Sequence, residues 1–93
     1  MAYSLAFKKD ALKEWRALDN TVREQFKSKL DERLTNPHVP ASKLLGQTSR
    51  YKIKLRNMGF RLVYEVRDTE LIVIVVAIGK RERNAVYKAA AKR

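Results

Sequence analysis

Residues 50–64 of this 93-residue chain, RYKIKLRNMGFRLVY, decide its fold. Apolar and polar side chains alternate along both halves of the stretch, and a period of two is typical of a β-strand that buries one face. The apolar positions are Tyr51, Ile53, Leu55, Phe60, Leu62 and Tyr64, and the intervening positions include Lys52, Lys54, Arg56 and Arg61. Residues 57–59 (NMG) predict a tight turn, because glycine readily adopts the positive φ that such turns need. The sequence therefore predicts a β-hairpin with one apolar face for the core and one cationic face for a negatively charged partner.

Composition narrows the classes of function. The hydrophobic fraction of 45% is ordinary for a folded protein, and the length suits a single domain over residues 1–93 with one core. The chain has no cysteine and one histidine, which argues against disulfides, thiolate catalysis and histidine-pair sites, so no metal or other cofactor is expected. There is no apolar run of about 18 residues and no secretory signal pattern, which predicts a cytoplasmic protein without a membrane partner. The net charge of +11 favours a polyanion, most often nucleic acid.

The segments around the hairpin predict further strands and helices. Apolar spacing predicts a short strand over residues 2–7 and helices over residues 10–18 and 21–35, with Thr21 and Glu24 as a capping box. The run LIVIVVAI over residues 71–78 is rich in β-branched side chains, which predicts a central strand buried on both faces and ended by Gly79. The last segment, residues 80–93, predicts a weakly docked helix whose anchors are Val86, Tyr87 and alanines.

The element order β-α-α-β-β-β-α predicts an α+β domain. Its four-stranded sheet is expected to be largely antiparallel and to be covered by the first two helices, arranged as a helical hairpin. The cationic face of the strand hairpin is expected to look away from these helices. The chain after the central strand should return to the border of that face. The result is one concave, positive site formed by Lys52, Lys54, Arg56, Arg61, Lys80, Arg81, Arg83 and Tyr87.

The single histidine, His38, follows Pro37 in a predicted loop over residues 37–49. A catalytic histidine needs a partner that orients its ring, and no partner lies near it in the sequence. His38 is therefore interpreted as a solvated loop residue.

The side chains gathered at the predicted site suit phosphate chemistry. Arginine binds phosphate with paired hydrogen bonds, and crowded cations lower the pKa of lysine and tyrosine side chains. Such a site could assist the attack of an RNA 2′-hydroxyl on the adjacent phosphate. A basic strand face is nevertheless more often a plain phosphate-binding surface, and Tyr87 could simply stack on a base. Composition leaves RNA cleavage and passive RNA binding open.

Several motifs resemble the RelE toxins of bacterial toxin–antitoxin pairs. They are YKIKLRNMGFRLVYEV over residues 51–66, IGKRER over residues 78–83 and Tyr87, together with MAY, ALKEW and TVREQ nearer the start. The resemblance covers essentially the whole chain and implies the RelE-like fold. It also implies a ribosome-dependent, metal-independent messenger RNA endonuclease. Such a toxin enters the empty A site, cuts the codon after its second nucleotide by 2′-hydroxyl attack and halts translation.

The resemblance also assigns residues to roles. The catalytic positions of the family fall on Lys52, Lys54, Arg61, Arg81 and Tyr87. The two lysines are expected beside the attacking 2′-hydroxyl, to ionise it or to balance its charge. Arg61 is expected at the scissile phosphate, Arg81 beside the leaving 5′-oxygen, and Tyr87 on the displaced base. Further RNA contacts are expected from the surrounding basic residues Arg50, Arg56, Lys80, Arg83 and Lys43.

The implied partners are a RelB-like antitoxin, the 70S ribosome with its 16S ribosomal RNA, and messenger RNA. The antitoxin is expected to wrap the toxin, to displace or block the last helix, and to make most contacts when the complex represses its operator DNA. Two rival interpretations are a ParE-type toxin that poisons gyrase and a non-catalytic RNA- or ribosome-binding protein. The first lacks the RNA-cutting residue set, and the second does not account for the five residues together.

Two features depart from the family pattern. Leu45 stands where a basic residue that contacts ribosomal RNA is expected. The last helix of the family is expected to run beyond Arg93 with one or two apolar residues.

Overall fold

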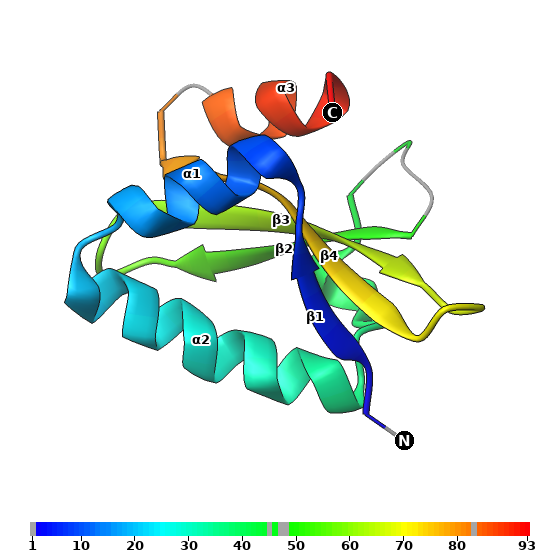
Figure 1. Ribbon diagram of the computed structural model, residues 1–93. Coiled ribbons are helices and arrows are strands. Elements are labelled where there is room, and N and C mark those ends of the chain that lie inside the picture. The colour runs from blue at the N-terminus through cyan, green and yellow to red at the C-terminus, as the bar shows by residue number, and fades with distance from the viewer. Residues whose placement is uncertain (1, 45, 47–48, 83) are drawn as a thin grey trace.

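The computed structural model describes residues 2–44, 46, 49–82 and 84–93, which form a sheet with helices on both faces (Figure 1). The elements in chain order are β1 (Ser4–Phe7), α1 (Lys9–Ala17), α2 (Asn20–Thr35), the 3₁₀ helix η1 (Pro40–Ser42), β2 (Arg50–Leu55), β3 (Phe60–Arg67), β4 (Ile72–Lys80) and α3 (Ala85–Ala91). The predicted α+β class and element order are confirmed. None of the described helices is long and apolar enough to cross a membrane.

The sheet has four strands in the order β1-β4-β3-β2. Strands β2, β3 and β4 pair antiparallel through short turns, as predicted, and β4 lies between β3 and β1. Strand β1 pairs with β4 in parallel, so the sheet is mixed. A parallel pair needs a long crossover, and here the chain passes through both N-terminal helices and the hairpin before β4 begins. The largely antiparallel sheet is therefore confirmed, with one parallel pair at its edge.

The hairpin of β2 and β3 has the predicted register and turn. Lys54 lies opposite Arg61, and Leu55 lies opposite Phe60. Gly59 in the turn has a φ of 67°, which glycine adopts without steric cost. Further along, Val63 faces Ala77 but Tyr64 faces Val75, so one residue of β4 bulges out of the ladder. The turn also includes Arg56, which the alternation placed on the strand.

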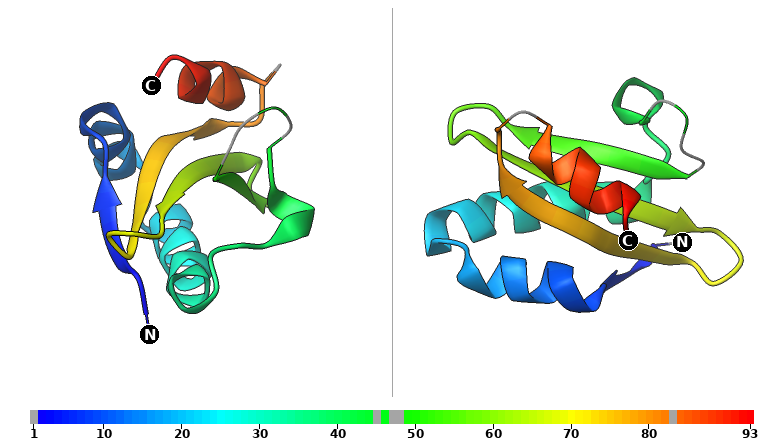
Figure 2. Two further views of the ribbon diagram at one scale, coloured as in Figure 1. Left: turned by 90° about the vertical axis from the view of Figure 1, so that its right-hand side faces the viewer. Right: turned by 90° about the horizontal axis from the view of Figure 1, so that it is seen from above.

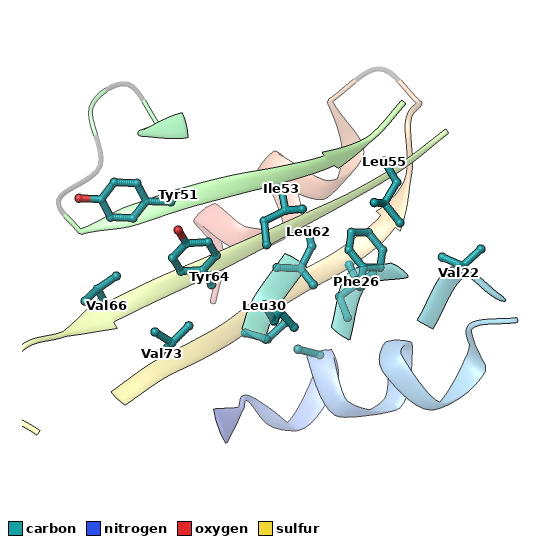
Figure 3. Packing of buried hydrophobic residues seen from close by; sticks show 13 residues of the cluster. Val22, Phe26, Leu30, Tyr51, Ile53, Leu55, Leu62, Tyr64, Val66 and Val73 are labelled. Carbon is teal, nitrogen blue, oxygen red and sulfur yellow. The ribbon is translucent and has the colours of Figure 1, made fainter. Parts of the chain in front are cut away.

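The main core fills the space between the sheet and the N-terminal helices (Figure 3). From α2 it receives Val22, Phe26 and Leu30, which recur at every fourth position and are buried as predicted. From the hairpin it receives the predicted apolar face, with Ile53 and Leu62 among the buried residues. Helix α1 lies mainly against β4, whereas α2 lies against β2. The two helices thus cover the same face of the sheet, each over a different strand.

A second, smaller cluster lies on the opposite face, where Figure 2 shows α3. It contains Val63, Val76 and Ala77 from the sheet and Val86 and Ala90 from α3. The sequence predicts one core, and the structure has two because α3 covers the other face of the sheet. A Cβ atom on Gly79 would lie 3.1 Å from Val86 Cγ2, so the glycine lets α3 approach β4 closely. Val86 is thus an anchor of α3, as predicted.

Two predicted boundaries are wrong. Strand β4 continues past Gly79 to Lys80, because Lys80 still pairs with Phe60 of β3. The last helix therefore starts later, at Ala85, after Asn84 in the left-handed conformation. The capping box is also wrong, because α2 begins at Asn20 and no side chain caps it, so Thr21 already lies inside the helix.

Candidate nucleic-acid interface

The cationic face of the hairpin lies on the same side of the sheet as α3. Lys52 and Lys54 are half-buried and alternate with the buried side chains of Ile53 and Leu55. Lys52 pairs across the ladder with Val63, whose side chain belongs to the cluster beneath α3. The prediction that the basic residues look away from the paired helices is confirmed.

Arg61 of β3 and Tyr87 of α3 form the most direct contact of the site. The guanidinium carbon of Arg61 lies 5.4 Å from the centroid of the Tyr87 ring, and its Nη1 donates to the Tyr87 hydroxyl at 3.4 Å. A cation held over an aromatic ring is attracted by the electrons of its face. The Nε of Arg61 is buried and has no hydrogen-bond partner among the described residues. Tyr87 thus holds one face of the Arg61 guanidinium, which is partly shielded from water.

Arg81 reaches the site because β4 ends beside the hairpin turn. Its main-chain N–H donates to the carbonyl of Gly59 at 2.7 Å, which ties the end of β4 to the turn. A depression of about 130 Å³ opens between these segments. It is lined by Lys54, Leu55, Arg56, Phe60, Arg61 and Arg81. The structure therefore brings together four cations from β2, its turn, β3 and the end of β4, with Tyr87 against Arg61.

The crowding of cations changes the proton affinity of Lys54. The positive charge of Lys52 is the main cause that lowers the pKa of Lys54, followed by desolvation and by Arg61, Arg56 and Arg81. A lowered pKa increases the fraction of neutral amine that can accept a proton near neutral pH. The direction agrees with the expectation from the sequence.

Three other predicted RNA contacts lie outside this depression. Lys80 lines a different hollow with Glu14 and Glu82, beside α3. Arg50 donates to Glu65 at 3.1 Å and to the Ala90 carbonyl at 2.6 Å, near the start of β2. Lys43 is exposed, and its backbone pairs with that of Tyr51 at the same end of β2. Arg83 lies outside the described residues, as does Leu45. The RNA contacts of these residues stay predictions.

Two residues that the sequence motifs did not select, one of them basic, lie beside the basic depression. Gln25 and Lys29 of α2 line a second hollow of about 210 Å³ together with Lys54, Arg56 and Asn57. Lys54 and Arg56 therefore line both hollows. Helical spacing shows that Lys29 faces solvent. It does not show that Lys29 lies close to β2, which starts 21 residues later in the sequence. This closeness comes from the packing of α2 on β2.

His38 has partners that its local sequence does not reveal. Its Nδ1 lies 2.8 Å from the Tyr51 hydroxyl, and its Nε2 lies 2.7 Å from Asp68 Oδ1. The Tyr3 hydroxyl donates to the same carboxylate oxygen at 2.7 Å. The His38 side chain is 42% exposed, so the interpretation as a solvated loop residue holds only in part. His38 joins the loop to β2 and to the turn between β3 and β4.

The hydrogen bonds to Asp68 predict a pH dependence of stability. They lower its pKa, mainly through His38 and then Tyr3. Since the folded-state pKa is lowered, the stabilising effect of Asp68 is complete above its unfolded pKa of about 4 and disappears as the pH falls through the folded value. The melting temperature of wild type should therefore be higher than that of Asp68→Asn at pH 7, and this difference in melting temperature should shrink below about pH 4. Thermal melts of both proteins from pH 3 to 7 would show this, and a constant difference would contradict it.

The described residues contain no group of three or more histidine, aspartate and glutamate side chains placed to hold a metal ion.

Comparisons with known proteins identify the family. A family model described as the ParE toxin of type II toxin–antitoxin systems matches residues 5–85. The mRNA interferase toxin RelE of Escherichia coli strain K12 is 56% identical over 100% of this chain and 98% of its own length. The chain belongs to the RelE family of type II toxins. A putative RelE-like toxin of Escherichia coli is 54% identical over the same shares of both chains.

Solved RelE structures share the fold. The free state of an E. coli RelE mutant superposes with a TM-score of 0.92 at 54% identity, covering 100% of this chain and 98% of that one. The toxin chain of the intact E. coli RelBE toxin–antitoxin complex superposes with a TM-score of 0.84 at 55% identity, covering 88% of this chain and 100% of that one. The predicted resemblance to the RelE family and its fold is confirmed.

Proposed function

We propose that this RelE-family protein is the toxin of a type II toxin–antitoxin pair and acts as a messenger RNA interferase. It binds the A site of the 70S ribosome, against 16S ribosomal RNA, and cleaves the messenger RNA codon there. The observation that carries the proposal is the gathering of Lys54, Arg61 and Arg81 around one depression, with Tyr87 against Arg61. The 56% identity to a protein named mRNA interferase toxin supports the same activity.

The reaction proposed is an internal transesterification of RNA. The 2′-oxygen attacks the neighbouring phosphorus, the P–O5′ bond breaks, and the products end in a 2′,3′-cyclic phosphate and a 5′-hydroxyl. Lys54 takes the proton from the 2′-hydroxyl, because its lowered pKa leaves more of the amine free to accept it. Lys52 balances the charge of the 2′-oxygen and helps to keep that pKa low.

The two arginines stabilise the negative charge that develops. Arg61 binds the non-bridging phosphate oxygens, which gain charge as the phosphorane forms. Arg81 stabilises the leaving 5′-oxygen electrostatically, and that oxygen takes its proton from water, because guanidinium does not release a proton readily. Tyr87 stacks on the displaced base and holds the Arg61 guanidinium in place.

Replacing Lys54 by arginine tests the proton transfer. Arginine keeps the charge but does not accept a proton, so Lys54→Arg should lower the single-turnover cleavage rate by about 10² or more. The wild-type rate should rise about tenfold per pH unit below the lowered pKa of Lys54, and this slope should disappear in the variant. Lys52→Arg is the matched control and should keep the slope. A Lys54→Arg variant with the wild-type rate and slope would refute the assignment.

The partners follow from the same proposal. A RelB-like antitoxin neutralises the toxin by wrapping it and by displacing or blocking α3, which carries Tyr87. The complex represses its own operon, with DNA contacts made mainly by the antitoxin. The toxin acts in the cytoplasm, where ribosomes and messenger RNA are found.

Two assays distinguish this proposal from its rivals. Cleavage should be fast on messenger RNA held in ribosomes with an open A site. On free messenger RNA it should be at least about 10³-fold slower. The reason is that the side chains of the toxin lack a well-matched acid and base, so the rate depends on how the ribosome positions the RNA. DNA supercoiling by gyrase should be unaffected. Inhibition of gyrase without RNA cleavage would instead support the ParE-type interpretation. Ribosome binding without cleavage would support passive binding.

A further inference from the structure

The β1 edge of β4 is only partly covered by a strand. The parallel ladder of β1 ends where Phe7 lies opposite Val75, but β4 continues to Lys80. Backbone groups beyond the ladder need other partners, because an unpaired buried N–H or C=O destabilises the fold. Two side chains provide them. The Ile78 N–H donates to Glu14 Oε1 at 3.0 Å, and Arg93 Nη1 donates to the Val76 carbonyl at 3.0 Å.

Glu14 of α1 and Arg93 also bind each other. Arg93 Nη1 lies 2.8 Å from Glu14 Oε1, and Nη2 lies 3.2 Å from Oε2, which is the paired geometry favoured by guanidinium and carboxylate. Hydrogen bonding to Glu14 is the main cause that raises the pKa of Arg93. The Arg93 side chain is 21% exposed. Lys8 donates to the Arg93 carbonyl, so the end of the chain is held from two sides.

These contacts matter because α3 is short and adds to them only its packing in the smaller cluster, the Arg50 hydrogen bond to the Ala90 carbonyl and the contact of Tyr87 with Arg61. The helix has seven residues, its first turn has no side-chain cap, and its only buried side chains are Val86 and Ala90. A helix this short is not stable by itself in water. Its contacts with the rest of the fold therefore decide where Tyr87 lies. The pair of Glu14 and Arg93 connects the end of α3 to both α1 and β4.

We propose that the Glu14–Arg93 pair positions Tyr87 for RNA cleavage. This inference rests on the proposed function. Glu14 and Arg93 do not touch the basic depression, so they act through α3 and are positioning residues. When the pair is broken, α3 shifts, Tyr87 moves from Arg61, and both the stacked base and the phosphate lose alignment. A displacement of about 1 Å at a reacting centre can cost up to 10² in rate.

The test uses Glu14→Gln with Glu24→Gln as its matched control. Glutamine keeps an oxygen for the Ile78 N–H but removes the charge of the carboxylate nearest to Arg93. Asp10, whose Oδ2 lies 3.7 Å from Arg93 Nε, keeps its charge in wild type and variant alike. Both variants make the protein more basic by the same amount, and Glu24 is exposed on α2. At saturating toxin, Glu14→Gln should reduce the cleavage rate on programmed ribosomes by about tenfold, whereas Glu24→Gln should leave it unchanged. Arg93→Lys should behave like Glu14→Gln, and ribosome affinity should not fall in any of the three.

A double-mutant cycle separates positioning from general destabilisation. In a Tyr87→Ala background, Glu14→Gln should cause no further loss of rate, because the residue on which it acts is gone. Amide exchange should be faster in residues 85–93 of Glu14→Gln than in wild type and unchanged in α2. Equal losses in the wild-type and Tyr87→Ala backgrounds, or unchanged exchange in α3, would overturn the inference. If wild type does not cleave on ribosomes, the proposed function fails instead, and the exchange experiment still decides whether Glu14 and Arg93 hold α3.

Discussion

Arg61→Ala should lower the cleavage rate on programmed ribosomes by about 10²–10³, which is the usual loss when one preorganised donor to a developing charge is removed. Arg61 is the cation best placed for this role. It lies in the depression with Lys54 and Arg81, its Nε is buried, and Tyr87 holds its guanidinium on one face. Single-turnover kinetics with saturating toxin measure the effect on the chemical step.

The control for Arg61→Ala is Arg16→Ala, an equal loss of charge on the exposed side of α1. It should change the rate by less than about threefold, since long-range charge effects are screened by salt. Arg61→Lys should fall between the two, because lysine keeps the charge but not the paired hydrogen bonds. If Arg61→Ala and Arg16→Ala lose the same small factor, Arg61 supplies only general attraction for RNA.

Phe26→Ala should cost about 3–5 kcal/mol in the free energy of unfolding, because it removes a fully buried ring and leaves a cavity. Phe26 is 0% exposed and lies in the main core between α2 and the sheet. Small domains have a total stability of about 5–15 kcal/mol, so the variant should be marginally folded. Urea unfolding followed by circular dichroism measures the loss. Lys27→Ala, exposed on the same helix, should stay within about 0.5 kcal/mol, and a loss below about 1 kcal/mol for Phe26→Ala would contradict the packing.

The sequence predicts the features that follow from local periodicity. Alternation in residues 50–64 identifies both strands of the hairpin and assigns Lys52, Lys54 and Arg61 to the face away from α1 and α2. The β-branched run identifies β4 as an interior strand. These signals are strong because burial of one face imposes the pattern on every second residue.

Features that depend on distant partners could not be predicted in this way. The start of α3 at Ala85 rather than at Lys80 depends on the pairing of Lys80 with Phe60, which extends β4 beyond Gly79. The partners of His38 lie 13 and 30 residues away. Glu14 and Arg93 are 79 residues apart, and nothing near either one in the sequence suggests the contact. Each of these contacts exists only after the sheet has formed.

The most direct test of the proposed function is to map RNA cleavage on ribosomes with a defined codon in an open A site. Wild type should cut after the second nucleotide of that codon and leave a 2′,3′-cyclic phosphate and a 5′-hydroxyl. Arg61→Ala and a ribosome-free reaction should give almost no product. A cut outside the A-site codon, fragments that end in a 3′-hydroxyl, or ribosome binding without any cut would contradict the proposal.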